Sequence, residues 1–253
     1  FSHPVDMSVR EMEEIDHKTA VNSETMEDLL QQIDRLHGEF GPVGGYINWQ
    51  SVINVAFQLR GEMIFVDMYD APDLVHHFLA EIRKALIATA TTVQERQRAT
   101  GFYVNHFTVS NCVMNMLSPE MYAEFVLPHD RAIALCFERF GVHTCEWDVT
   151  PYLEVLSRLP KVGYIDMGSQ SEMPRVRESF PEARRAVLYS PVKLESAPLE
   201  EIRADIRRIA MEAGPADVVL ADVQVTTPEE RIHEFIRICE EARELVPAEF
   251  ATF

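Results

Sequence analysis

Residues 118–147, SPEMYAEFVLPHDRAIALCFERFGVHTCEW, contain the unit that decides the fold. Ser118 followed by Pro119 is typical of a helix start, because serine caps free N–H groups and proline fits the first turn. The predicted helix runs to about residue 140, where Gly141 ends it. Residues 141–145 follow at once and predict a short strand. A helix that leads directly into a strand is one step of an alternating α/β chain.

The same alternation extends over most of the chain. Apolar residues at helical spacing predict helices near 25–37, 51–60, 72–98, 118–140, 150–158, 172–179, 198–213 and 228–244. Apolar, β-branched and aromatic runs predict strands at 45–49, 102–109, 141–145, 162–167, 186–189 and 218–223. Residues 1–24 are predicted to be irregular. Strands that alternate with helices indicate a parallel sheet.

Six strands suit a doubly wound sheet, whereas eight would close a (β/α)8 barrel, a TIM barrel. No Gly-x-Gly-x-x-Gly or phosphate-binding loop follows a predicted strand. This weakens the nucleotide-binding form of the doubly wound sheet. The numbering begins at Phe1 and not at a methionine, which indicates that the natural start is missing. A barrel would then need two strands upstream of Phe1.

Composition limits the classes of protein to consider. The chain has 253 residues, of which 47% are hydrophobic and 25% charged, and we expect one domain over residues 1–253. A net charge of −18 argues against nucleic-acid binding. No apolar run approaches the roughly 20 residues that span a membrane. Four scattered cysteines and no visible signal peptide favour free thiols, or metal ligands, in the cytoplasm.

His143 and Cys145 are the first candidates for chemistry. Residues i and i+2 of a strand point to the same face, so the two side chains can converge on one ion. Imidazole nitrogen and thiolate sulfur are a good ligand pair for zinc. Two ligands do not make a site, however, and a buried strand end with an inert cysteine fits the same residues.

Polar residues occur at the ends of five successive predicted strands. Because the carboxyl ends of parallel strands converge on the functional site, we expect these residues to lie near one another. In chain order they are Asn111 with Cys112, His143 with Cys145, Asp166, Ser190 and Asp222. Polar residues also cap strands routinely, so each of them taken alone has a structural explanation.

Asp222 is the natural third ligand to test. With His143 and Cys145 it would leave one position of a metal open for water or substrate. A carboxylate is a harder donor than a thiolate and would bind zinc less selectively. Capping of the following turn is the structural alternative for Asp222. Glu146 is a candidate further ligand or base, or else a loop residue, and Cys112 is an alternate ligand.

The order of several short motifs is similar to that of a known superfamily. Over about residues 40–245 the chain resembles the uroporphyrinogen decarboxylase superfamily, which includes cobalamin-dependent methyltransferases that move a methyl group between a corrinoid protein and a thiol. The motifs are 41–49, 59–62 with 70–72, 117–128, His143-x-Cys145, 163–166 and 227–230. The resemblance implies a (β/α)8 barrel that lacks its first one or two strands in this sequence.

One motif separates the branches of this superfamily. The decarboxylase carries Gly-His-Gly after its last strand, whereas this chain reads Ala221-Asp222-Val223-Gln224, without a histidine. The corrinoid methyltransferases carry His-x-Cys after the fifth strand and a cysteine after the eighth, all on zinc. His143 and Cys145 match that pattern. The third position falls on or beside Asp222, an aspartate where the family has cysteine.

The resemblance therefore implies a zinc-dependent methyltransferase that acts with a corrinoid (cobalamin) on a partner protein and a thiol or related acceptor. It implies His143, Cys145 and Asp222 as metal ligands. Its remaining candidates are Glu146, Asp166 and Asn111 for catalysis, and Tyr189, Ser190 and Asn111 for cofactor binding. Two alternatives stay open: a metal-free decarboxylase acting on a tetrapyrrole, and a non-catalytic corrinoid-binding homologue. An oligomer is compatible with either.

Overall fold

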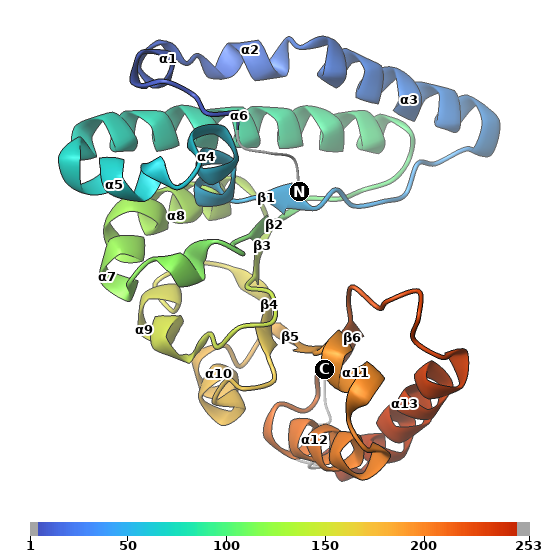
Figure 1. Cartoon of the computed structure of the whole chain (residues 1–253). Helices are drawn as coiled ribbons and strands as arrows, with labels where there is room; N and C mark the ends of the chain where they lie inside the picture. Colours follow the sequence, from blue (N-terminus) through green and yellow to red (C-terminus); the bar gives the residue numbers. More distant parts are fainter. Residues whose placement is uncertain (1–4, 247–253) are drawn as a thin grey trace. The chain divides into compact units, whose positions relative to one another are not determined.

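The strands of this protein belong to a parallel sheet. The computed structural model describes residues 5–246, and its strands follow one another in chain order across the sheet (Figure 1). They are β1 (Trp49–Gln50), β2 (His106–Ser110), β3 (Arg139–His143), β4 (Val162–Gly168), β5 (Arg184–Tyr189) and β6 (Asp217–Leu220). Trp49 lies opposite Val109, and Ala186 opposite Asp217, in parallel pairs. Sequential parallel strands with helices between them confirm the predicted α/β class and are the pattern of a (β/α)8 barrel.

Helices precede β1, fill the connections between the strands and follow β6. Before β2 they are α1 (Val9–Glu14), α2 (His17–Val21), α3 (Glu24–Phe40), α4 (Val52–Arg60), α5 (Met63–Asp70) and α6 (Pro72–Ala99). Between β2 and β4 they are η1 (Met114–Met116), α7 (Pro119–Met121), η2 (Tyr122–Val126), α8 (Leu127–Cys136), η3 (Thr150–Tyr152) and α9 (Leu153–Leu156). After β4 they are α10 (Met173–Ser179), α11 (Pro191–Ser196), α12 (Leu199–Glu212), α13 (Glu229–Ala242) and η4 (Arg243–Leu245).

The chain divides into two compact units. The first contains residues 1–141 and 159–161, and the second residues 142–158 and 162–253. In the first unit the long α6 runs beside α3 (Figure 1), and its core includes Phe78, Phe107 and Phe125. In the second unit the core includes Val187, Ile206 and Phe235, from β5, α12 and α13. Burying each of these side chains stabilises its unit by about 1.5–3 kcal/mol. The expectation of a single domain stays a prediction.

The prediction of an irregular segment over residues 1–24 is wrong, because α1 and α2 are helical there. Ser8 and Glu11 cap α1 reciprocally: the Glu11 N–H donates to Ser8 Oγ, and the Ser8 N–H donates to the Glu11 carboxylate at 2.7 Å. At α2, the Lys18 N–H donates to Asp16 Oδ1 at 3.0 Å. Ser8-x-x-Glu11 is a capping box in the sequence, so this start was readable.

The predicted helix 118–140 is too long. Ser118 caps its start as expected, but a π-helical segment, Tyr122–Val126, interrupts it and α8 ends at Cys136. Gly141 is therefore not the end of a helix; it lies inside β3. A Cβ atom on Gly141 would lie 2.4 Å from Thr108 Oγ1, so glycine permits the side chain of Thr108 to approach.

The bounds of several strands also differ from the prediction. The strand expected at 45–49 is reduced to Trp49–Gln50, and the strand expected at 218–223 ends at Leu220. Asp222 has a φ of +54°, in the left-handed region, so the extended backbone cannot continue through it. No helix within residues 5–246 has the length and apolar character needed to cross a membrane.

Candidate metal centre

His143 and Cys145 lie together at the carboxyl end of β3. The strand ends at His143, and Cys145 stands in the following turn with a φ of +63°, which is uncommon for any residue but glycine. Cys145 Sγ lies 3.2 Å from His143 Nε2. The predicted convergence of the two side chains is present, although the turn produces it and not the alternation of a strand.

Asp166 of β4 orients the imidazole of His143. Its Oδ2 lies 2.5 Å from His143 Nδ1, while its Oδ1 accepts the backbone N–H of Thr144 at 2.6 Å. A carboxylate on Nδ1 favours the tautomer that carries its proton there and directs the lone pair of Nε2 toward Cys145. Asp166 is only 1% exposed, so this orientation is fixed inside the protein. Carboxylate, imidazole and a ligand position form the arrangement usual in metal sites.

Tyr164 holds the carboxylate of Asp166 from the same strand. Its hydroxyl donates to Asp166 Oδ2 at 3.0 Å. Burial and the nearby carboxylate raise the pKa of Tyr164 far above its ordinary value, so the phenol remains a hydrogen-bond donor at neutral pH. Tyr164 lies in the 163–166 motif, but the sequence indicated no role for it. Its place two residues before Asp166 in a strand was the available signal, because such residues share a face.

Gly168 fixes the other side of the turn. A Cβ at this position would lie 2.2 Å from the backbone oxygen of Glu146. The N–H of Gly168 donates to the Trp147 oxygen at 3.0 Å, and Gln170 Nε2 donates to the Glu146 oxygen at 2.6 Å. The backbone of Glu146 is thus held, while its side chain is exposed at the surface.

His143 and Cys145 of the second unit are candidate metal ligands. Cys112 follows β2 at its carboxyl end in the first unit, as Cys145 follows β3 in the second. Cys112 stays the alternate ligand that the sequence offered. Asp222 of the second unit lies beyond β6, is exposed, and its backbone oxygen accepts Gln224 Nε2 at 3.0 Å. Its role as a ligand stays a prediction.

The other candidates have mainly structural contacts. Asn111 is completely buried, and its Nδ2 donates to Asp130 Oδ2 at 3.0 Å. Tyr189 packs on Phe235 of α13, with ring centroids 5.1 Å apart, and its hydroxyl donates to Asp205 of α12. Ser190 is half-buried at the start of α11. These contacts place the side chain of Tyr189 toward the helices, and the predicted cofactor-binding roles remain predictions.

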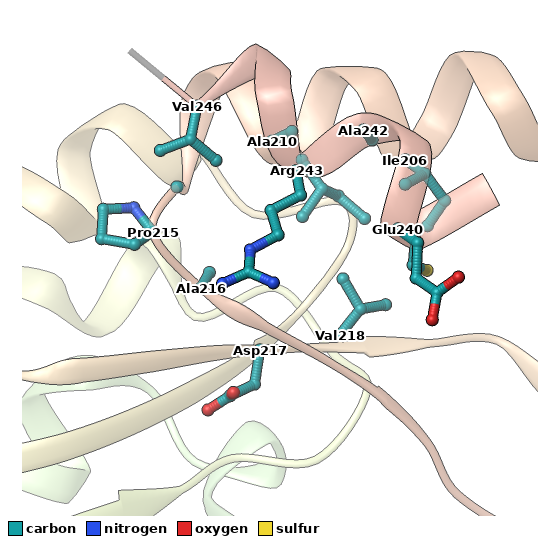
Figure 2. Close-up of a pocket in the computed structure, with 13 residues that line it drawn as sticks. Ile206, Ala210, Pro215, Ala216, Asp217, Val218, Glu240, Ala242, Arg243 and Val246 are labelled. Carbon is teal, nitrogen blue, oxygen red and sulfur yellow. The ribbon is translucent and has the colours of Figure 1, made fainter. Parts of the chain in front are cut away.

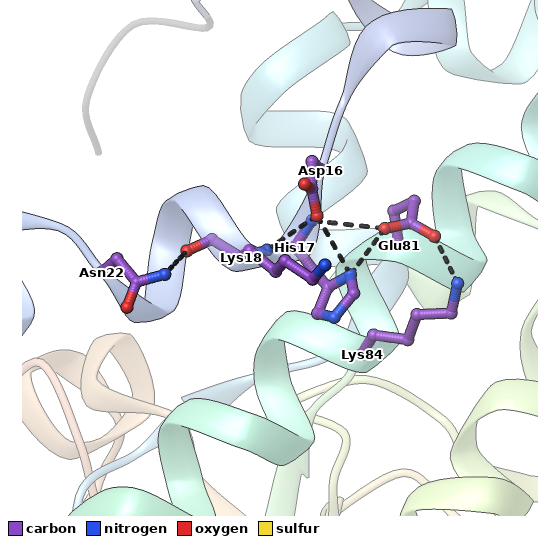
Figure 3. A network of polar contacts seen from close by, with 6 residues as sticks. All are labelled: Asp16, His17, Lys18, Asn22, Glu81 and Lys84. Carbon is purple, nitrogen blue, oxygen red and sulfur yellow. Dashed lines mark hydrogen bonds and ion pairs between the residues drawn. The ribbon is translucent and has the colours of Figure 1, made fainter.

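A second group of potential ligands, Asp16, His17 and Glu81, lies in the first unit. Figure 3 shows that Glu81 is already engaged: one of its oxygens lies 2.9 Å from His17 Nδ1, and the other is paired with the ammonium of Lys84. The ammonium of Lys84 already supplies a positive charge to the Glu81 carboxylate. The contacts of this group therefore hold the start of α2 against α6.

A pocket of about 400 Å³ lies in the second unit at the amino end of β6 (Figure 2). Its walls are mainly apolar side chains of α12 and α13, with Ala216, Val218 and Val246, and Arg243 extends toward Asp217. His143 stands at the carboxyl end of a parallel strand, which is the opposite edge of a sheet. The pocket is therefore separate from the candidate metal centre.

Comparison with known proteins shows the fold but no family. No model of a protein family matches the chain, and no curated protein matches it. Among solved structures, a methyltransferase from Methanosarcina mazei superposes with a TM-score of 0.67 at 17% identity, covering 95% of this chain and 71% of the methyltransferase. At this identity the likeness confirms the α/β fold. The resemblance to the uroporphyrinogen decarboxylase superfamily stays a prediction.

Proposed function

We propose that this protein is a zinc-dependent methyltransferase in which His143 and Cys145 bind the metal, with Cys112 or Asp222 as the third ligand. One observation carries the proposal: Asp166 orients His143 so that its Nε2 faces the Cys145 thiol at 3.2 Å. An inert buried histidine does not need a cysteine on one nitrogen and a buried carboxylate on the other. The fold shared with a methyltransferase supports the choice of reaction class.

The ligand types favour zinc. An imidazole and a thiolate are a soft pair that suits zinc better than magnesium, calcium or manganese, and Cys112 would add a second thiolate. Three protein ligands leave a fourth position for a substrate, as in catalytic zinc sites. The alternative set replaces Cys112 by Asp222, which would make the site harder and less selective. The two sets differ in the residue whose loss weakens binding.

Bound zinc supplies Lewis acidity, which lowers the pKa of a thiol at the open position and favours its thiolate. The side chains of the protein then have separate tasks. Asp166 keeps His143 in the tautomer that donates from Nε2, and Tyr164 keeps Asp166 in place. Glu146, exposed beside Cys145, is the group proposed to take the proton of the acceptor thiol.

The methyl donor in this proposal is a corrinoid carried by a partner protein. The corrinoid would supply the methyl group to the sulfur of the acceptor and keep the electron pair of the bond that breaks. Glu146 would take the thiol proton and pass it to water. The acceptor is a small thiol or related nucleophile.

Metal content and methyl transfer test the proposal directly. We expect the purified protein to bind one zinc, and Cys112→Ser and Cys145→Ser to weaken binding while Cys136→Ser, at an exposed cysteine, does not. Loss of binding in Asp222→Ala but not in Cys112→Ser would replace Cys112 by Asp222. Methylcobalamin with a thiol should show demethylation in its absorption spectrum. Binding of methylcobalamin without demethylation would favour the non-catalytic reading, which the aspartate at 222 supports.

A further inference from the structure

A buried polar network lies next to Cys112 in the first unit. Asp130 of α8 and Asn111 are both completely shielded from solvent. Asp130 Oδ2 accepts Asn111 Nδ2 at 3.0 Å and the hydroxyl of Tyr122 at 2.6 Å. Tyr122 begins the π-helical segment that interrupts the helix before α8. Such interruptions are frequent at functional sites.

Two oxygens of this network have no hydrogen-bond partner among the described residues. They are Asn111 Oδ1 and Asp130 Oδ1, both buried. Buried acceptors are almost always hydrogen-bonded, so two orphans on groups that already contact each other need an explanation. An ionised carboxylate can only accept, and so it cannot serve Asn111 Oδ1. A protonated carboxyl has one O–H to donate.

We propose that Asp130 carries a proton on Oδ1 and donates it to Asn111 Oδ1, so that a reciprocal acid–amide pair fixes the turn that bears Cys112. This one proton gives both Asn111 Oδ1 and Asp130 Oδ1 a hydrogen-bond partner. Asn111 Nδ2 donates to one carboxyl oxygen, and the other carboxyl oxygen donates back to the same amide. The pair is closed and neutral, as a solvent-free site requires.

The surroundings favour the neutral acid below about pH 6. Burial raises the pKa of Asp130 to about 6, against the smaller opposing effects of the Tyr122 and Asn111 hydrogen bonds. Burial raises the pKa of Tyr122, so its hydroxyl stays a donor. The neighbouring His129 does not supply a compensating charge, because burial, followed by Arg83 and His76 of α6, lowers its pKa to about 4.

The pair connects to Cys112 through the backbone. Asn111 directly precedes the cysteine, and its backbone oxygen accepts the N–H of Met114 at 3.0 Å. On the far side of Cys112, the N–H of Val113 donates to Asn54 Oδ1 at 3.0 Å. The thiol thus stands in a turn that is anchored before and after it. Asp130 is a positioning residue in this scheme, and the link to metal binding rests on the proposed function.

Asp130→Asn separates this proposal from a merely structural carboxylate. An amide at 130 copies the protonated acid, because its NH2 can donate to Asn111 Oδ1 while its oxygen accepts from Asn111 and Tyr122. We expect Asp130→Asn to fold and, at about pH 5, to keep zinc affinity within about twofold, whereas Asp130→Ala and Asn111→Ala lose roughly tenfold. If Asp130→Asn loses as much affinity as Asp130→Ala, the carboxylate itself is needed and the proposal fails.

Two readouts detect the proton without a metal. The infrared spectrum should contain a carboxylic-acid C=O band at about pH 5 that is missing in Asp130→Asn. A raised pKa means that the folded state holds a proton that the unfolded chain releases, so this contribution to stability is lost as pH rises from about 4 to about 6. Relative to Asp130→Asn, the unfolding constant of the parent protein should rise about tenfold between about pH 5 and about pH 8. No band and no rise would overturn the proposal.

Cys112→Ser distinguishes failure of the pair from failure of the proposed function. If Cys112→Ser leaves zinc affinity unchanged while the band and the pH dependence are present, then the acid–amide pair stands and Cys112 is not a ligand. The positioning role is then wrong. If Cys112→Ser abolishes binding but Asn111→Ala has no effect, Cys112 is a ligand and the positioning role is again wrong.

Discussion

Two histidines of this protein are bound to carboxylates through Nδ1, yet they stand in different settings. His17 meets Glu81, and His143 meets Asp166. Glu81 is paired with the ammonium of Lys84. Among the described residues, the partners of the Asp166 carboxylate besides His143 are neutral donors, the N–H of Thr144 and the hydroxyl of Tyr164. On the other side of the His143 ring, Nε2 lies 3.2 Å from the thiol of Cys145. A carboxylate–histidine pair therefore points to a metal only when no resident cation is present and a second soft donor faces the ring.

The largest expected effect is on zinc binding when a histidine is removed. His143→Ala should lower the affinity by more than the roughly 100-fold that outer contacts of a site can cost, because a direct ligand is lost. His17→Ala should leave the affinity unchanged, which makes it the matched control. Competition with a chromogenic chelator measures both. Equal losses in the two variants would abolish the distinction between the pairs.

The next effect concerns the carboxylates. Asp166→Asn should reduce zinc affinity by roughly 10–100-fold, since the amide no longer selects the tautomer that donates from Nε2. The same change at the other pair, Glu81→Gln, should not alter zinc affinity. The same competition assay applies. An unaffected Asp166→Asn variant would show that His143 does not depend on its carboxylate.

Glu81→Gln should instead act on stability. Hydrogen bonds to Lys84, above all, and to His17 lower the pKa of Glu81 to about 2, so its stabilising contribution is present above about pH 4.5 and is lost as pH falls through about 2. At pH 7 we expect a loss of about 1–2 kcal/mol in the free energy of unfolding. Urea denaturation across this pH range measures it, with the exposed Glu13→Gln as control. A difference that persists at the acid end would exclude the ion pairs as its cause.

The smallest effect is expected at Tyr164. Tyr164→Phe removes one hydrogen bond to Asp166, which corresponds to about 0.5–1.5 kcal/mol, a two- to tenfold loss of zinc affinity. Tyr189→Phe removes a similar hydroxyl-to-carboxylate bond, to Asp205, in the same unit. That control should lose stability but not zinc. If both variants bind zinc equally well, Tyr164 contributes only to folding.

The order of strands and helices and the ligand pair could be predicted from the sequence, but the contacts between side chains could not. Periodicity and turn residues predicted the parallel α/β order, and the His-x-Cys spacing indicated a ligand pair. The sequence could not show that Cys145 leaves the strand, because its left-handed backbone depends on contacts with β4. Nor could it assign Asp166 to His143, since pairing between strands is not local in sequence.

Glycines and aspartates were the least predictable residues. Glycine is typical of a helix end, yet Gly141 lies within a strand. Thr108 occupies the space that a side chain at position 141 would need. Asp130 was not singled out, since an acidic residue in a helix normally faces water. Its burial results from tertiary packing of α8. Local patterns carry no information of this kind.

Gly168 has a consequence for recognising distant relatives. Any side chain there would collide with the Glu146 carbonyl and displace the turn that carries Cys145. A chain that keeps His-x-Cys but has a bulky residue at the position of Gly168 therefore cannot retain this turn geometry. His-x-Cys, followed one strand later by Asp-x-Gly, is accordingly a more selective search pattern than the two ligands alone, and it can be applied to sequences too divergent to align.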